Sequence, residues 1–241
     1  MRRLGMIFLV VLGLLAGCGG GAAPGGPAGP IEDPALRHVG EECVHGDERK
    51  DLVTFQSKGR VVTGYETGKG AVGVILAHQA DGDLCQWKSY ASYLAGKGYR
   101  ALAINFDVTP FSENVPAAIE AMRREKDVKQ VFLIGASMGG TAVLLAAAQM
   151  QPPVAGVVSL SAPTVYAGMD ALTPMPQLTV PAFFAAADGD GRFANDTREM
   201  YNAAKSSDKK LVIVPGSKHG TALLSDEMSA QVEQFIKSHN V

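Results

Sequence analysis

The 241-residue chain carries almost no net charge, a single tryptophan and only three cysteines. Its 22 basic and 24 acidic residues give a formal net charge of −2, and no basic stripe with interleaved aromatic residues indicates a nucleic-acid partner. The few cysteines and histidines lack metal-ligand spacing, so we predict no metal site. The 46% hydrophobic content is typical of a globular protein, which excludes a disordered chain and a bundle of membrane spans.

Two short patterns resemble ligand sites but lack the context that those sites need. A G-x-G-x-x-G string at residues 68–73 leads into a strand-like run, whereas a dinucleotide site follows a strand and opens a helix. The acidic stretch that begins at Asp188 has Arg192 and Phe193 where a calcium loop needs an oxygen ligand and a glycine. We therefore predict no cofactor.

The N-terminus has the features of an export signal. Arg2 and Arg3 precede an apolar run, Met6–Leu15, that is too short to span a bilayer comfortably. Small residues follow and end at Cys18, in a pattern that resembles the lipobox of bacterial lipoproteins. The resemblance implies a signal peptide at 1–17 and a cell-membrane lipoprotein, held extracytoplasmically by acyl chains such as palmitate on Cys18. The alternatives are an ordinary secretory signal or a retained anchor, with the cysteine incidental.

A tether is predicted at 18–33, since Gly19–Pro30 contains only Gly, Ala and Pro and offers no side chain that could anchor a core. The remaining residues, 34–241, suffice for one α/β domain. Lipidation of the first cysteine leaves Cys43 and Cys85 as a pair in an oxidising compartment, and we predict a disulfide between them. It would close a loop of about 43 residues and contribute roughly 4 kcal/mol. The alternative is two separate buried thiols.

Beyond the tether, short apolar runs alternate with helix-length segments, which predicts a mostly parallel sheet with helices on both faces. An antiparallel N-terminal hairpin is expected at Leu52–Ser57 and Arg60–Glu66. The other predicted strands are Ala71–His78, Tyr99–Phe106, Gln130–Ala136, Val154–Ala162, Val180–Ala187 and Lys210–Pro215, and the predicted helices are Gln86–Lys97, Val115–Lys126, Met138–Gln149, Ala194–Ser206 and Thr221–Ser238.

The segment GASMGG at residues 135–140 contains a G-x-S-x-G motif centred on Ser137. The motif alone is weak, but here the serine lies between an apolar strand and an alanine-rich helix. A sharp strand-to-helix turn strains and exposes a nucleophile, and the helix N-terminus behind it favours an oxyanion. The alternative is an inert serine in a glycine-rich packing turn.

A serine nucleophile needs a base, and the base needs an acid that orients it. His219 follows the last predicted strand, and its loop reaches the carboxyl edge of the sheet. Asp188 and Asp190 end the preceding strand, between Ser137 and His219 in chain order.

These features together resemble the α/β-hydrolase superfamily, and within it the small, cap-less branch that is similar to dienelactone hydrolase. In that family the acid is commonly an Asp followed three residues later by Val or Phe, which Asp190 with Phe193 matches and Asp188 does not. The resemblance also implies an oxyanion hole made by the backbone N–H groups of Met138 and Gln79, with the Gln79 side chain playing no part. His78 is expected to brace that loop.

The implied activity is that of a serine esterase, which hydrolyses carboxylic esters through an acyl-enzyme. Only 17 residues, 163–179, occupy the position where relatives insert a lid, so we expect a small-molecule or envelope-displayed ester as substrate. Two rival functions are acyl transfer to an envelope acceptor and binding by a catalytically inactive lipoprotein. The candidate pocket walls, which are equally well interpreted as core, are Met169, Leu172 and Met175 on one side and Leu84 and Trp87 on the other.

Overall fold

The computed structural model describes residues 33–40 and 42–240. These residues belong to a compact unit that spans Asp33–Val241. The predicted signal peptide, Cys18 and nearly all of the predicted tether lie outside the described residues.

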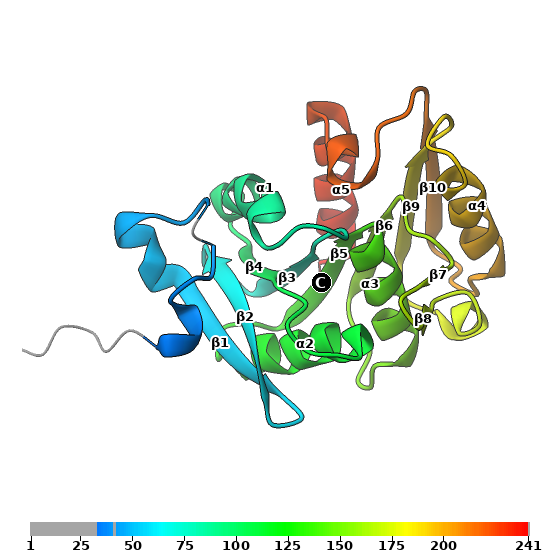
Figure 1. The fold of residues 1–241 in the computed structure, drawn as a ribbon. Coiled ribbons are helices and arrows are strands. Elements are labelled where there is room, and N and C mark those ends of the chain that lie inside the picture. Colours follow the sequence, from blue (N-terminus) through cyan, green and yellow to red (C-terminus); the bar gives the residue numbers. More distant parts are fainter. Residues whose placement is uncertain (1–32, 41, 241) are drawn as a thin grey trace, which may run out of the picture. The chain divides into compact units, whose positions relative to one another are not determined.

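An eight-stranded sheet with the order β1-β2-β4-β3-β5-β6-β9-β10 forms the centre of this unit (Figure 1). Strands β3 to β6, β9 and β10 are mutually parallel, and β1 and β2 form the predicted antiparallel hairpin, which joins the sheet antiparallel to β4. The strands are β1 (Leu52–Ser57), β2 (Arg60–Thr67), β3 (Val72–Ala77), β4 (Arg100–Ile104), β5 (Gln130–Ala136), β6 (Gly156–Leu160), β9 (Ala182–Ala187) and β10 (Lys209–Val214).

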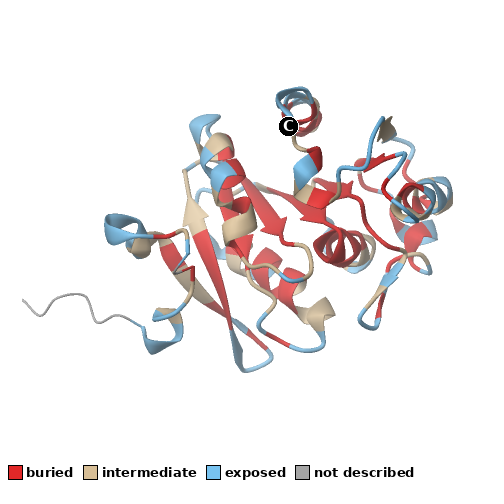
Figure 2. Ribbon diagram, turned by 45° about the horizontal axis from the view of Figure 1, so that its top comes forward, coloured by how far each residue is buried: buried red, intermediate tan, exposed pale blue. Residues whose placement is uncertain are grey.

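Helices cover both faces of the sheet, as predicted. One apolar cluster contains residues of α1 (Cys85–Gly96) and α5 (Asp226–Ser238), and the other contains residues of α2 (Asn114–Arg124), α3 (Met138–Gln149) and α4 (Phe193–Ala203). The central strands between them are buried except for the first residues of β4 and β5, which explains why their sequences are nearly continuous apolar runs (Figure 2). Within the described residues, no helix has both the length and the apolar character required to cross a bilayer.

Short elements complete the unit. Residues 163–179 hold only a two-stranded ribbon and one turn of 3₁₀ helix, so no cap domain covers the sheet there. The short elements are β7 (Val165–Tyr166), β8 (Met169–Asp170), η1 (Pro34–Leu36), η2 (Gly46–Asp51), η3 (Phe111–Glu113), η4 (Met175–Gln177) and η5 (Gly220–Leu223).

The last helix begins later than the apolar spacing predicted. The predicted start of this helix at Thr221 is wrong, because η5 ends at Leu223 and α5 starts at Asp226. The hydroxyl of Ser225 accepts a hydrogen bond from the N–H of Met228 at 3.3 Å, so this serine caps a new helix.

The predicted disulfide between Cys43 and Cys85 is present, with the two Cα atoms 5.7 Å apart. Cys85 is the first residue of α1, so the bond ties the segment before η2 to the start of this helix.

Strand β3 lies between β4 and β5, so the chain leaves β3 toward one side of the sheet and later returns on the other. Ligands of open α/β sheets bind at such a switch point, outside the carboxyl ends of the strands. The loop after β3 contains Gln79 and the turn after β5 contains Ser137, so the predicted oxyanion loop and the predicted nucleophile both lie at this switch point.

Candidate active site

Ser137 occupies the single-residue turn between β5 and α3. Its backbone has φ 49° and ψ −116°, a region that non-glycine residues seldom adopt and that stores strain. The N–H of Ser137 donates to the carbonyl of Leu160 at the end of β6, at 2.8 Å, which holds the turn against the neighbouring strand. The residue is 7% exposed, so it forms part of the floor of the carboxyl edge.

The glycines on either side of Ser137 are required by close packing. A Cβ atom at Gly135 would overlap the carbonyl of Gly139, and one at Gly139 would overlap the carbonyl of Ala77 at the end of β3. Helix α3 can therefore start directly beside β3 only with this spacing of glycines, which gives the G-x-S-x-G pattern a physical cause.

His219 and Asp190 are joined by a hydrogen bond. The imidazole Nδ1 lies 2.8 Å from Oδ2 and 3.0 Å from Oδ1 of the carboxylate. Asp190 is 8% exposed and the ring of Phe193 packs on the imidazole at 4.3 Å between centroids, so the pair is partly shielded from water. Asp188 is exposed instead, and its Oδ1 accepts the N–H of Gly216 at 2.9 Å. Of the two candidate acids, Asp190 is the one that contacts the imidazole.

Ser137 and His219 lie at the same edge of the sheet. Gly220, which follows His219, packs so closely on Ala136 that a Cβ atom on it would lie 3.4 Å from the Cβ of Ala136. Among the described residues, no hydrogen bond joins the serine hydroxyl to the imidazole. Such bonds are often long in enzymes without substrate and tighten when substrate binds.

The two predicted oxyanion donors differ in their surroundings. The first hydrogen bond within α3 runs from the N–H of Thr141 to the carbonyl of Ser137 at 3.0 Å, so the helix itself makes no use of the Met138 N–H. The N–H of Gln79 donates to Oε1 of Gln86 at 3.1 Å. The Gln79 N–H, which was predicted to bind the carbonyl oxygen of a substrate, is therefore already bonded to the side chain of Gln86.

The side chain of Gln79 has a contact that the sequence did not indicate. Its Oε1 accepts the N–H of Thr221 at 3.2 Å, which links the loop after β3 to the loop that carries His219. Gly220, which lies between His219 and Thr221, has φ 55°, and a Cβ atom on it would overlap Oε1 of Gln79. The side chain thus joins two loops, while the expectation that it takes no part in the oxyanion hole stays a prediction. The two partners lie 142 residues apart in the chain, and no local pattern marks the contact.

His78 holds the loop after β3 from within. Its Nδ1 lies 2.7 Å from the carbonyl of Gln79, and its ring meets Phe106 edge-on at 5.0 Å between centroids. Burial lowers the pKa of the imidazole by more than the Gln79 carbonyl and the nearby carboxylates raise it. The ring is therefore neutral near pH 7, with its Nδ1–H donating to the carbonyl.

The predicted pocket walls belong to the core. Leu84, Trp87, Met169 and Met175 are all buried within the apolar clusters, and only Leu172 is partly exposed.

Among residues 33–40 and 42–240, no group of three or more His, Cys, Asp or Glu side chains could hold a metal ion.

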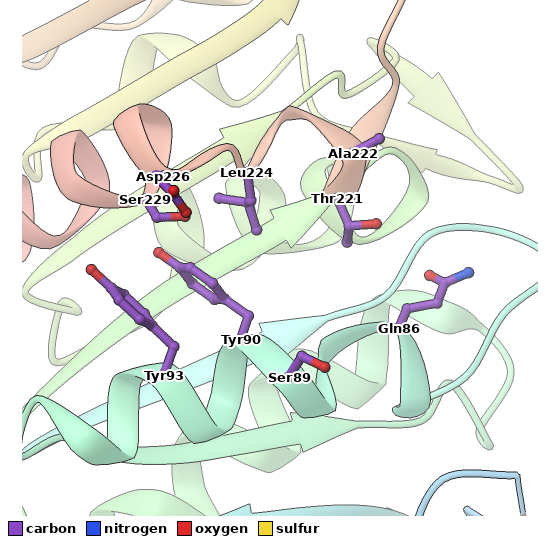
Figure 3. A pocket seen from close by; sticks show the side chains of 9 residues that line it. All are labelled: Gln86, Ser89, Tyr90, Tyr93, Thr221, Ala222, Leu224, Asp226 and Ser229. Carbon is purple, nitrogen blue, oxygen red and sulfur yellow. The ribbon is translucent and has the colours of Figure 1, made fainter.

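A groove of about 640 Å³ lies between α1 and the segment from η5 to α5 (Figure 3). Gln86 and Thr221 lie at one end of the groove. The same two residues bond to Gln79, so this end of the groove adjoins the carboxyl edge.

A family model described as the alpha/beta hydrolase fold matches residues 74–176. No curated protein matches the chain significantly. Among solved structures, a dienelactone hydrolase from Anabaena variabilis is 19% identical with a TM-score of 0.67, over 78% of this chain and 96% of that one. An esterase from Pyrococcus furiosus has a TM-score of 0.67 at 14% identity, over 78% and 89% of the two chains. Est1E from Butyrivibrio proteoclasticus, solved with ferulic acid, has a TM-score of 0.67 at 16% identity, over 78% and 98%.

The similarity extends over most of each solved chain, and the matched residues include the strand, turn and helix around Ser137. Together with the strand order, these comparisons show that the chain has the fold of the α/β-hydrolase superfamily.

Proposed function

We propose that the protein is a serine hydrolase that cleaves carboxylic esters, with Ser137 as nucleophile, His219 as base and Asp190 as the acid that orients the base. The observation that carries the proposal is the His219–Asp190 hydrogen bond at the sheet edge where Ser137 sits in a strained turn. Ser161 has the same backbone strain, so the strain alone does not mark a nucleophile; the argument is that Ser137 combines it with a neighbouring loop that presents a paired imidazole.

The chemistry follows from these roles. His219 takes the hydroxyl proton as Ser137 attacks the ester carbonyl, and the same proton then passes to the departing alcohol. Water next attacks the acyl-enzyme, releases the acid and restores the serine. Asp190 keeps the Nδ1 proton in place, so that Nε2 is the nitrogen free to accept a proton, and it stabilises the imidazolium that forms.

The backbone N–H groups of Met138 and Gln79 are the proposed donors to the oxyanion. Because the Gln79 N–H is bonded to Gln86, the carboxamide of Gln86 leaves this position when the carbonyl oxygen of the substrate takes it. The substrate oxygen gains charge in the transition state while a neutral carboxamide does not, so the exchange favours the transition state over the resting enzyme.

Small esters, or ester groups displayed on larger molecules, are the proposed substrates. The short ribbon and 3₁₀ turn at residues 163–179 leave the carboxyl edge uncapped. The similar solved structures, which include esterases and a dienelactone hydrolase, support the same class of reaction.

Labelling by a fluorophosphonate tests the assignment. The wild-type protein should be labelled at Ser137 and should hydrolyse p-nitrophenyl acetate, and Ser137→Ala should do neither. Ser161 offers a matched control, because it also follows a buried strand with positive φ, at 50°, and is buried. Ser161→Ala should keep both labelling and turnover. Turnover that survives Ser137→Ala would refute the assignment.

We also propose that the enzyme is an extracytoplasmic lipoprotein anchored through Cys18. The lipobox-like sequence before Cys18 and the disulfide in the folded unit support an oxidising location. Cys18→Ser should move the protein from the membrane fraction to the soluble fraction. Unchanged fractionation would contradict lipidation at this residue.

A further inference from the structure

The groove between α1 and α5 is lined on one side by a single face of α1. Gln86, Ser89, Tyr90 and Tyr93 have the i, i+3, i+4, i+7 spacing that places side chains in a row along a helix. At 1.5 Å per residue, this row is about 10 Å long. It starts beside the proposed oxyanion loop and runs away from it along the side of the sheet.

Five hydroxyl-bearing side chains line the groove. On the α1 wall, Ser89 and the two tyrosines supply three, of which the Tyr93 hydroxyl donates to Oε2 of Glu233 at 3.2 Å, and Thr221 and Ser229 add two on the opposite wall. A hydroxyl both donates and accepts hydrogen bonds, so the lining matches a ligand whose own groups do both. The tyrosine rings, Leu224 and Ala222 supply apolar surface between these hydroxyls, so the lining alternates apolar surface with polar groups.

The hydroxyl of Tyr90 carries most of the argument. The residue is 9% exposed, and its oxygen is buried with no hydrogen-bond partner in the part of the chain that the structure describes. In Figure 3 the oxygen points across the groove toward Asp226 and Ser229. Burial raises the pKa of this phenol, so it remains a protonated donor. A buried, unpartnered hydroxyl costs free energy, and a ligand that bonds to it removes that cost.

The charge of the groove excludes anions. No lysine, arginine or histidine is among the described residues that line it, and Asp226 supplies a carboxylate on the α5 side. The lysines beyond its far end, Lys97 and Lys237, are both paired with Glu233, at 3.6 and 2.8 Å. A phosphate or carboxylate ligand would find no free cation here.

The aromatic side chains match a flat ligand with one apolar face. The rings of Tyr90 and Tyr93 stack at 5.4 Å between centroids, with 23° between their planes. Their hydroxyls point to the same side (Figure 3). A pyranose ring has C–H groups on its faces and hydroxyls at its rim, which suits this mixture of ring surface and polar atoms.

We propose that this groove binds the saccharide part of the substrate, so that the enzyme hydrolyses acyl esters of neutral sugars. This inference rests on the proposed function. The ester carbonyl would lie at the Gln86 end, near Gln79 and His219, and the sugar would extend toward Tyr93. In hydrolysis, water supplies the oxygen of the released acid, and the proton from His219 goes to the sugar oxygen that leaves.

Binding can be measured without catalysis, because the chain has one tryptophan and it lies behind the groove. Trp87 is fully buried, with its ring 5.9 Å from that of Tyr90. In the Ser137→Ala variant, cellobiose, maltose and N,N′-diacetylchitobiose should change the Trp87 emission saturably, whereas inorganic phosphate should not. Tyr90→Phe should weaken saccharide binding about 2- to 10-fold, as expected for one neutral hydrogen bond. The matched control Tyr201→Phe lies on α4, away from the groove, and should bind as the parent does.

Tyr90→Phe removes a hydroxyl that has no protein partner among the described residues, so the variant should be at least as stable as the parent. Ser89→Tyr provides a second variant, since Ser89 is exposed and a larger side chain there fills the groove. In kinetics with two acetyl esters, Ser89→Tyr should raise KM for an O-acetylated disaccharide several-fold more than it raises KM for p-nitrophenyl acetate.

The outcomes separate the two proposals. If p-nitrophenyl acetate is hydrolysed through Ser137 but no saccharide perturbs Trp87, or if the groove variants act equally on both esters, the saccharide inference is wrong and the hydrolase stands. If saccharides bind but Ser137→Ala changes no ester turnover, the proposed function is wrong, and the inference about the substrate is wrong with it.

Discussion

Replacing Asp190 by asparagine, and in a second variant Asp188 by asparagine, tests the proposal that Asp190 orients His219 while Asp188 only accepts a backbone hydrogen bond. Asp190 contacts the imidazole of His219 at 2.8 Å. At an effective dielectric constant of about 20, a unit charge pair at that distance is worth about 6 kcal/mol. This attraction is present only when the imidazole becomes an imidazolium, as it does in the transition state.

Asparagine keeps the shape but loses the charge, and its amide can donate to Nδ1 and so place the imidazole proton on Nε2, where it blocks the base. We therefore expect Asp190→Asn to lower kcat by roughly 10³- to 10⁴-fold, which corresponds to about 4 to 6 kcal/mol of lost stabilisation. In Asp188→Asn, the side-chain oxygen can still accept the N–H of Gly216, so kcat should stay within about 3-fold of the wild type.

The assay is p-nitrophenyl acetate hydrolysis, with thermal unfolding of both variants as the control for folding. Equal losses in the two variants, or the larger loss at Asp188, would refute the assignment of the acid.

Three further predictions concern the surroundings of the site. Gln79→Ala leaves the N–H of Thr221 without its partner and should lower kcat/KM about 10-fold with little change in unfolding midpoint; an unchanged kcat/KM would show that the link does not position His219. Reduction of the Cys43–Cys85 bond should cost about 4 kcal/mol and lower Tm by roughly 8 to 16 °C, measured by thermal melts with and without reductant; identical midpoints would contradict this. Burial lowers the pKa of the His78 imidazole, so below about pH 6.5 the unfolded chain protonates this ring while the folded chain keeps it neutral. The protonation of His78 therefore leaves the free energy of unfolding unchanged above that pH, and lowers it as the pH drops toward the lowered pKa of the folded state. Urea unfolding near neutral pH and at about pH 5 should show a smaller loss for His78→Gln than for the wild type, and equal losses would disprove the effect.

The sequence predicted the sheet well, because every central strand is a buried apolar run flanked by turn residues. It could not place the start of α5, since Thr221, Ala222 and Leu223 continue the apolar spacing of the helix. The predicted helix is interrupted by the non-helical backbone of Leu224, with ψ 64°, and by the new cap at Ser225. Both depend on backbone geometry that the spacing of side chains does not record.

The candidate site was predictable in part. Ser137, Asp190 and His219 stand at the ends of predicted strands, and parallel strands bring their carboxyl ends to one edge. The sequence left five apolar residues open as pocket walls or core, because a tryptophan such as Trp87 has the same local sequence in either place; the structure buries four of them in the core and leaves Leu172 partly exposed. The groove became visible only when α1 and α5 were placed side by side.

The site is also assembled in a fixed order in time. During synthesis, β3, β5 and Ser137 are made some 80 residues before the chain reaches His219, the proposed base. Phe235 of α5 then packs on Phe132 and Phe183 and completes one apolar face of the sheet. An unfinished chain therefore has Ser137 but not His219 and has an open core, so the proposed hydrolase could become active only after the final segment has folded.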